Sequence, residues 1–167
     1  MNRERTNRKR NSPIVLFAIF ATLLSLTSCE RGPAFSHYEH FGSDGWRKND
    51  ALHYSICPEE AAPYNMFIDL RMCSLYPYTQ LTLLVRSSHS NGSQSHTDTI
   101  NIETADPEGN RTGNGLNIKK HHIDLPQVVL APNDTFSITV AHNMSREYLP
   151  GIIDIGVIAE RQNDTTH

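Results

Sequence analysis

The sequence predicts an all-β domain, an antiparallel β-sandwich that is jelly-roll-like with about eight strands, after an N-terminal lipoprotein signal peptide. From residue 51 onward, apolar and polar side chains alternate with a period of two, as in strands that bury one face. Turn-forming residues separate these runs, and no stretch with helical periodicity follows the first 28 residues. Two sheets packed face to face would bury all the apolar faces, and a barrel is the alternative architecture.

The chain begins with a basic segment that is followed by a short apolar run. Five basic residues lie within the first ten positions: Arg3, Arg5, Arg8, Lys9 and Arg10. Residues 14–26 are almost wholly apolar. As a helix they would measure about 20 Å, which is too short for a hydrocarbon core of about 30 Å. This combination is typical of a secretory signal peptide.

The apolar run closes on Leu26-Thr27-Ser28-Cys29, which has the form of a bacterial lipobox. We therefore predict residues 1–28 to be a cleaved signal peptide and Cys29 to carry the lipid, palmitate included. Several acyl chains would anchor the protein stably in a membrane, because each buried CH₂ contributes about 0.8 kcal/mol. The alternative is a plain signal peptide or membrane anchor that contains a cysteine by chance.

The charge balance argues against a nucleic-acid partner. The chain has 15 basic and 18 acidic residues. Five of the basic residues and one of the acidic residues lie in residues 1–28. Residues 29–167 therefore have 10 basic and 17 acidic residues, which gives a formal charge of −7. This part has no basic cluster that would bind phosphates. Its 139 residues are enough for one domain with its own core.

The alternation sets the expected domain organisation. Clear strand patterns cover residues 52–56, 64–72, 81–86, 99–103, 135–140 and 153–157, with weaker candidates at 115–118 and 123–130. We expect residues 29–45 to be a lipidated tether, 46–161 to be the β-sandwich domain, and 162–167 to be a polar C-terminal tail. Trp46, the only tryptophan, is expected to cap one end of the core.

Three turns predict how neighbouring strands connect. Asn91-Gly92 is a strong two-residue hairpin signal, and it would pair Leu83 with Ile100 and Leu81 with Ile102. Residues 106–109 (Asp-Pro-Glu-Gly) have the order of a type I turn. Residues 131–134 are expected to form another hairpin, with Val129 opposite Phe136.

Two cysteines remain after the lipobox, and we expect both to be free thiols. If Cys57 and Cys73 end consecutive antiparallel strands, they lie on the order of 30 Å apart. A disulfide requires Cα atoms within about 7 Å of each other.

The sequence marks no catalytic or metal centre. His121 and His122 are adjacent and would point to opposite faces of a strand, and no cysteine has metal-ligand spacing with His37 and His40. The Gly-x-Ser-x-Gly motif of a nucleophile elbow is missing from the sequence. We therefore expect a non-enzymatic protein without a metal or another cofactor.

One alternative is a calcium-binding turn. Asp106, Glu108 and Asn110 alternate oxygen ligands as a calcium loop does. However, Arg111 and Asn117 occupy the positions at which that loop requires glycine and glutamate. A plain turn fits these residues better.

The residues that we expect to bind a protein partner are Tyr76, Pro77 and Tyr78, joined by Asp106 and Gly109 in a neighbouring loop. Aromatic side chains in a loop on a rigid scaffold suit partner binding. A proline between them reduces the entropy that is lost on docking. The alternative is that the two tyrosines pack over the open end of the sandwich.

Several blocks follow one another as they do in the gliding motility lipoprotein GldH family, which the chain resembles over nearly all of residues 29–160. These blocks are residues 45–50, 63–71, 76–81, 98–100, 105–109 and 151–156, together with Gly113, Gly115 and the lipobox. One departure is Arg111-Thr112, where the family pattern leads us to expect an aromatic residue.

The resemblance implies a non-enzymatic lipoprotein of the Gram-negative outer membrane that acts as an accessory component of an envelope assembly, as in gliding motility. Its partners would be the membrane, through the acyl chains on Cys29, and proteins of the cell envelope. The alternative function is glycan binding by the β-sandwich. The resemblance leaves open which membrane face the domain occupies.

Overall fold

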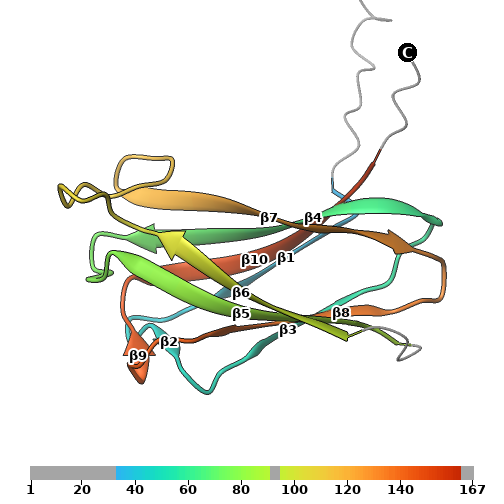
Figure 1. The fold of residues 1–167 in the computed structure, drawn as a ribbon, viewed down its shortest axis with the longest axis horizontal. Helices are drawn as coiled ribbons and strands as arrows, with labels where there is room; N and C mark the ends of the chain where they lie inside the picture. The colour runs from blue at the N-terminus through green and yellow to red at the C-terminus, as the bar shows by residue number, and fades with distance from the viewer. Residues whose placement is uncertain (1–32, 91–94, 163–167) are drawn as a thin grey trace, which may run out of the picture. The chain divides into compact units, whose positions relative to one another are not determined.

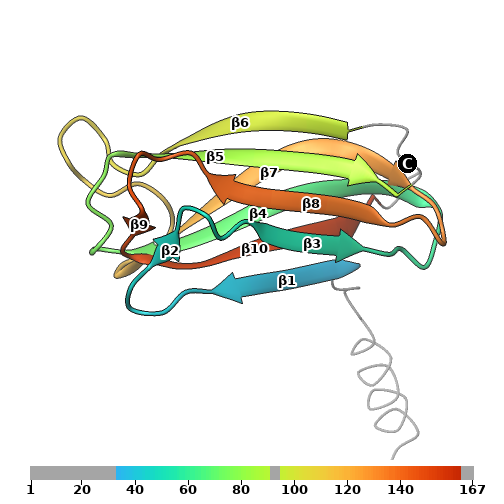
Figure 2. The same ribbon diagram turned by 90° about the horizontal axis from the view of Figure 1, so that it is seen from below.

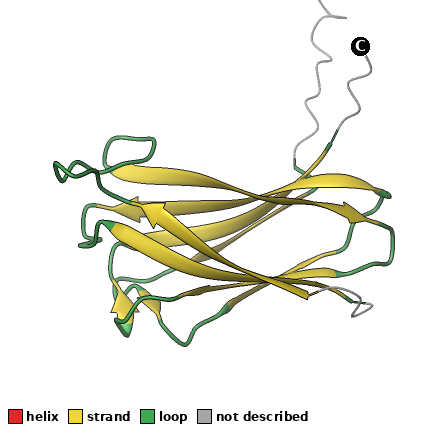
Figure 3. Ribbon diagram, in the orientation of Figure 1, coloured by secondary structure: helices red, strands yellow, loops and turns green. Residues whose placement is uncertain are grey.

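A computed structural model describes residues 33–90 and 95–162 (Figure 1). The ten strands are β1 Phe35–His40, β2 Trp46–Arg47, β3 Leu52–Ile56, β4 Ala62–Cys73, β5 Gln80–His89, β6 Ser95–Glu103, β7 Ile118–Leu130, β8 Phe136–His142, β9 Tyr148–Leu149 and β10 Ile152–Arg161. In Figure 3, the described part of the chain consists of strands and loops. No helix in these ranges is long and apolar enough to cross a membrane. The predicted signal peptide, Cys29 and the Asn91-Gly92 turn lie outside the described residues.

The eight long strands have the jelly-roll order, in two layers that Figures 1 and 2 show from two sides. One sheet has the order β1-β10-β4-β7, the other has the order β3-β8-β5-β6, and the short β2 and β9 pair separately. The antiparallel pairs β1–β10, β3–β8, β4–β7 and β5–β6 join the first long strand to the last, the second to the next-to-last, and so on inward. The chain is therefore one long hairpin folded over itself, which confirms the predicted architecture.

Most predicted strands occur where the alternation placed them, but of the two weak candidates only the second is a strand. β7 starts at Ile118, so it contains the second candidate and only the last residue of the first. The predicted register between β5 and β6 is confirmed: Leu83 pairs with Ile100, and Leu81 pairs with Ile102.

The predicted hairpin at residues 131–134 is wrong. Val129 pairs with Pro63 on β4, whereas Phe136 pairs with residues of β3 and β5 in the other sheet. The segment crosses from one layer to the other. The prediction failed because a turn sequence marks a chain reversal without specifying the sheet of the next strand.

Of the two remaining cysteines, Cys57 follows β3 and Cys73 ends β4, and these strands lie in different sheets. Cys57 and Cys73 are free cysteines.

The folded domain begins earlier than the expected boundary at residue 46. Residues 35–40, which the prediction assigned to the tether, form β1 and pair with β10 from Phe35–Ala159 to His40–Asp154. Their sequence, Phe-Ser-His-Tyr-Glu-His, has too few apolar residues to reveal a strand. β1 is an edge strand that pairs on one side only.

The core lies between the two sheets and uses the inward positions of the alternation. The buried inward residues are Leu52, Tyr54, Ile56, Tyr64, Met66, Ile68, Leu70, Met72, Leu81, Leu83, Val85, Phe136, Ile138, Val140, Ile155, Val157 and Ala159. Burial of apolar area of this kind is the main favourable contribution to folding.

Trp46 closes one end of this core, as predicted. It is fully buried, stacks on Phe41 with ring centroids 5.4 Å apart, and donates a hydrogen bond from Nε1 to the carbonyl oxygen of Asp50 at 2.8 Å. The buried His142 packs edge-on against its indole at 5.0 Å. His142 Nδ1 accepts a hydrogen bond from the amide of Met144 at 3.4 Å, while Nε2 is buried without a partner among the described residues.

The environment of His142 predicts acid sensitivity. Burial, together with repulsion by Lys48, lowers the pKa of His142 below its ordinary value. The unfolded chain takes up this proton near pH 6.5, so below that pH it binds more protons than the folded chain, and stability decreases as the pH falls. We expect the melting temperature to drop between about pH 7 and about pH 5, and to drop less in His142→Leu. Parallel pH curves for the two proteins would contradict this assignment.

A second buried polar group links strands β1, β4 and β7 of the β1-β10-β4-β7 sheet. Asp69 on β4 points to the outer face of this sheet yet is fully buried. Its carboxylate accepts hydrogen bonds from Tyr38 Oη on β1 at 2.7 Å, and from Lys120 Nζ at 2.8 Å and His122 Nδ1 at 2.6 Å on β7. Burial alone would raise the pKa of Asp69, but the hydrogen bonds outweigh it and hold the pKa below its ordinary value. Tyr38 reaches Asp69 by crossing β10 above Gly156.

Candidate functional site

The structure corrects one part of the predicted partner-binding loop. Tyr76 is completely buried, its ring lies edge-on to that of Tyr78 at 5.4 Å, and its hydroxyl donates to the carbonyl oxygen of Gln80 at 2.8 Å. Burial raises the pKa of Tyr76. Pro77 is exposed and Tyr78 is half-buried. Tyr76 is therefore a core residue that supports the loop, because a bulky ring next to the open end of a sandwich is drawn into it.

The second predicted loop lies beside the first one. Arg111 donates hydrogen bonds to the carbonyl oxygens of Tyr76 and Tyr78, the latter at 2.9 Å, and Thr104 Oγ1 donates to the same Tyr78 oxygen at 2.8 Å. Arg111 is the position at which the sequence departs from the expected family pattern. In this chain it joins the two loops through backbone contacts.

The turn at Asp106 has the predicted form. The amide of Gly109 donates to the Asp106 carbonyl oxygen at 3.0 Å, and Gly109 has a φ of 88°, which glycine adopts without strain. Asn110 donates to both carboxylate oxygens of Asp106, at 2.7 and 2.9 Å, and these hydrogen bonds lower the pKa of Asp106. The carboxylate is thus occupied by its own turn.

The candidate histidine pairs are not brought together. His37 lies on the inward side of the edge strand β1, where it is exposed and its ring centroid is 6.0 Å from that of Tyr54. His40 points to the opposite side, with Nδ1 3.2 Å from the carboxylate of Asp154. His122 binds Asp69 on the outer face, and His121 next to it points to the opposite face. Within the ranges that the structure describes, no three potential ligands form a metal site.

Sequence reasoning missed an exposed apolar surface at this end of the sandwich. Leu75 is 71% exposed, Leu116 is 94% exposed and Ile118 is 47% exposed. Cys73 pairs with Ile118, so the segment leaving β4 and the segment entering β7 lie side by side. We call Leu75, Leu116 and Ile118 the loop-end patch. The signal in the sequence was a leucine in each of two turn-rich segments, where no strand or helix would bury it.

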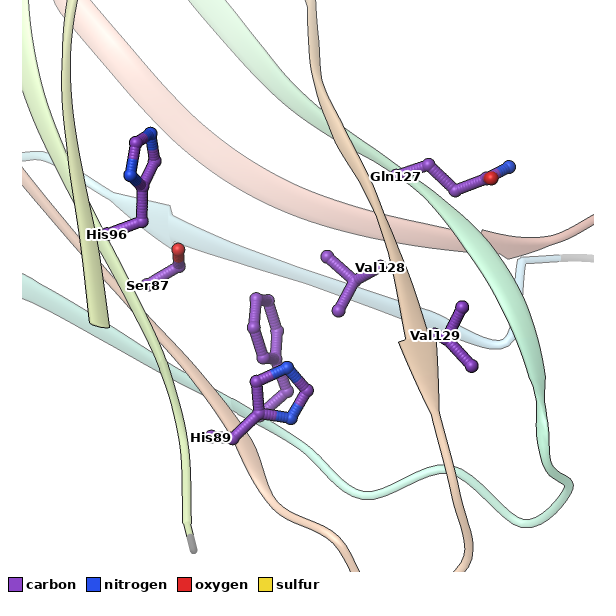
Figure 4. A pocket seen from close by; sticks show the side chains of 7 residues that line it. Ser87, His89, His96, Gln127, Val128 and Val129 are labelled. Atoms are coloured by element: carbon purple, nitrogen blue, oxygen red, sulfur yellow. The ribbon is translucent and has the colours of Figure 1, made fainter. Parts of the chain in front are cut away.

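A second feature that was missed is a pocket of about 340 Å³ between the edge of β7 and the ends of β5 and β6 (Figure 4). Its lining residues are Ser87, His89, His96, Gln127, Val128, Val129 and Phe136. Figure 4 shows Ser87 and His96 on one side, Val128 facing them from β7, and Gln127 pointing away. The signal here was that Ser87 and His89 continue the inward positions of Leu81, Leu83 and Val85.

The fold and these surfaces define a jelly-roll domain with an exposed apolar patch at one end and a pocket beside the edge of β7. The chain belongs to the GldH lipoprotein family, whose model matches residues 34–158. It is 31% identical over 110 residues to the gliding motility lipoprotein GldH of Flavobacterium johnsoniae. The match covers 65% of this chain and 65% of that protein, so it spans slightly less than two thirds of the relative.

Two solved structures have a distant likeness to the chain. One is a family GH115 4-O-methyl-alpha-glucuronidase with specificity for decorated arabinogalactans, with a TM-score of 0.43 and 14% identity over 81% of this chain and 18% of that one. Another is Eiger TNF from S. frugiperda, with a TM-score of 0.32 and 9% identity over 81% of this chain and 99% of that one. At these scores neither protein bears on the function of this chain.

Proposed function

We propose that this chain is a non-enzymatic accessory lipoprotein of the outer membrane that supports an envelope assembly, such as that for gliding motility, through contacts with protein partners. The observation that carries the proposal is membership in the GldH lipoprotein family. The lipobox at Cys29 provides the attachment to the membrane. The partners are proteins of the cell envelope, and the acyl chains hold the domain close to them.

The position of the first strand supports this arrangement. Phe35 pairs with Ala159 near the end of β10, whereas the loop-end patch lies beyond the other end of that sheet, where Ile118 pairs with Cys73. Cys29 precedes Phe35 by six residues, which span at most about 20 Å. β10 itself, with ten residues, is about 30 Å long. The lipid is thus attached at one end of the sandwich, and the patch is presented at the other.

The chemistry of the patch suits a protein partner. Exposed leucines that are removed from water on binding contribute favourably to the free energy of binding. In most interfaces, a few residues near the centre contribute most of that free energy. We assign Leu75 and Leu116 to the centre of the contact, with Pro77, Tyr78, Asp106 and Gly109 of the predicted site at its rim. Tyr76 supports the surface from below.

This proposal predicts that the double variant Leu75→Ser/Leu116→Ser loses its partner and keeps its anchor. The same envelope proteins should be crosslinked in intact cells by the wild type and by Ala131→Ser, a matched control in which an exposed apolar side chain at the opposite end is changed. The double variant should capture at least about tenfold less, which corresponds to about 1.4 kcal/mol. Its lipid mass and its fractionation with the outer membrane should remain those of the wild type.

Cys29→Ala provides the complementary reference. It should retain residues 1–28, carry no lipid and leave the outer-membrane fraction, although its urea unfolding midpoint stays unchanged. A wild-type mass equal to the bare polypeptide would overturn the lipid anchor. Equal capture by the wild type and a folded, anchored double variant would overturn the patch as the contact.

A further inference from the structure

The inner face of the β3-β8-β5-β6 sheet changes from apolar to polar toward one end. Along β5, the inward positions run from Leu81, Leu83 and Val85 to Ser87 and His89. Along β6, the residues paired with these positions run from Ile102 and Ile100 to Asp98 and His96. Ser87, His89 and Asp98 are half-buried and His96 is exposed, so this end of the inner face is polar and open to solvent, whereas the rest of it packs in the core.

Each of the two histidines is held by a carboxylate. His89 Nδ1 lies 2.8 Å from Asp134 Oδ2, and Ser90 Oγ donates to the other oxygen of the same carboxylate at 3.0 Å. His96 Nε2 lies 2.8 Å from Asp98 Oδ1. The contact with Asp134 orients the largely buried His89 imidazole, whereas His96 pairs with Asp98 at the surface. Each ring has a second nitrogen that can make another hydrogen bond.

The opposite wall and the floor of the pocket are apolar. Val128 faces Ser87 and His96 across the opening (Figure 4). Phe136 forms the floor and lies 4.9 Å from the His89 ring, edge to face. β7 and β6 are the edge strands of different sheets, so the gap between them gives access from solvent.

We propose that this pocket binds a neutral saccharide unit of an envelope glycan. A sugar ring has a hydroxyl-bearing edge and apolar C–H faces, which match the Ser87–His89–His96 wall and the Val128–Phe136 surface. The lining residues include no lysine, arginine, aspartate or glutamate, and nearby Asp98 and Asp134 are engaged by the histidines. This composition favours a neutral polar ligand over an ion.

The pocket lies at the end of the sandwich where the first strand begins. Val128 pairs with Tyr64, which also pairs with Arg161, and Phe35 pairs with Ala159 two residues earlier on β10. In the proposed anchored protein, the saccharide site is therefore close to the membrane and the loop-end patch is far from it. Both the glycan strands of the cell wall and the sugars of membrane lipids would present neutral units there.

The test measures saccharide binding by the full-length chain in detergent, using calorimetry and ligand-detected NMR. The probes are chitohexaose, maltohexaose, soluble glycan fragments of peptidoglycan, and neutral oligosaccharide released from outer-membrane lipids. We expect at least one probe to bind with a dissociation constant of about 1 mM or tighter, and the probe that binds identifies the source. If no probe binds at about 10 mM, the proposal is overturned.

Variants locate the binding in the pocket. Ser87→Ala and His96→Ala should each weaken binding, raising the dissociation constant about tenfold. Val128→Trp, which fills the opening, should abolish binding. His53→Ala is the matched control, since His53 is exposed on β3 and bonds Thr139 on the outer face. Wild-type affinity in folded Ser87→Ala and His96→Ala would overturn the site. The outcome is independent of the loop-end patch, because Leu75→Ser/Leu116→Ser should bind saccharide normally.

Discussion

Leu83→Asp is expected to prevent the domain from folding. Leu83 is fully buried and sits between Ile100 on β6 and His142 on β8. A carboxylate there would be taken from water into the apolar interface between the sheets, and even its neutral form would leave a polar group in that interface. The cost is several kcal/mol, a large part of the about 5–15 kcal/mol by which domains of this size are stable. Circular dichroism and urea unfolding should show loss of the cooperative transition.

The neighbouring position provides the control. Thr82 points to the outer face, where its hydroxyl donates to Asn101 Oδ1 at 2.8 Å. Thr82→Asp should shift the free energy of unfolding by no more than about 1 kcal/mol, because surface changes away from buried networks are usually small. If both aspartate variants lost the transition equally, the assignment of the two faces of β5 would be refuted.

Gly156→Ala is expected to cost about 2–4 kcal/mol of stability, although it adds only one methyl group. A Cβ at this position would lie 2.4 Å from two ring carbons of Tyr38, well inside contact distance. The ring must move, and Tyr38 then loses its hydrogen bond to the buried Asp69 carboxylate. Both overpacking and the loss of a donor to a buried charge destabilise the fold.

A double-mutant cycle separates this effect from any general intolerance at position 156. In a Tyr38→Ala background, Gly156→Ala should cost less than about 1 kcal/mol, because the ring that it displaces is gone. Gly42→Ala is a matched control, since a Cβ at Gly42 would meet no atom within 4 Å. Urea unfolding measures the free energies of the four proteins in the cycle and of the Gly42→Ala control. If Gly156→Ala lowered the free energy of unfolding equally in the two backgrounds, contact with Tyr38 would not be the reason that position 156 requires glycine.

The same outer-face network illustrates where sequence reasoning ends. Alternation correctly placed Asp69 on the outward side of β4, but outward residues are ordinarily exposed. Asp69 is buried because Tyr38 arrives from β1 and Lys120 and His122 arrive from β7. These residues are distant in sequence, and only the strand order brings them together.

The sequence by itself determined the features that depend on neighbouring residues. Period-two alternation identified most of the long strands and their inward faces, and the length of one turn set the β5–β6 register, because side chains on a strand alternate regardless of what lies opposite. Local order also predicted the turn at Asp106, which the structure contains, and the lipobox at Cys29, which lies outside the described residues and stays a prediction.

Tertiary structure decided which sheet each strand joins and what each face meets. It separated Val129 from Phe136, drew Tyr76 into the core, and left Leu75 and Leu116 in solvent. It also opened the gap between β6 and β7 beside inward-facing Ser87 and His89. A pattern along one strand specifies which side chains share a face, but burial and hydrogen bonding depend on partners that only the fold supplies.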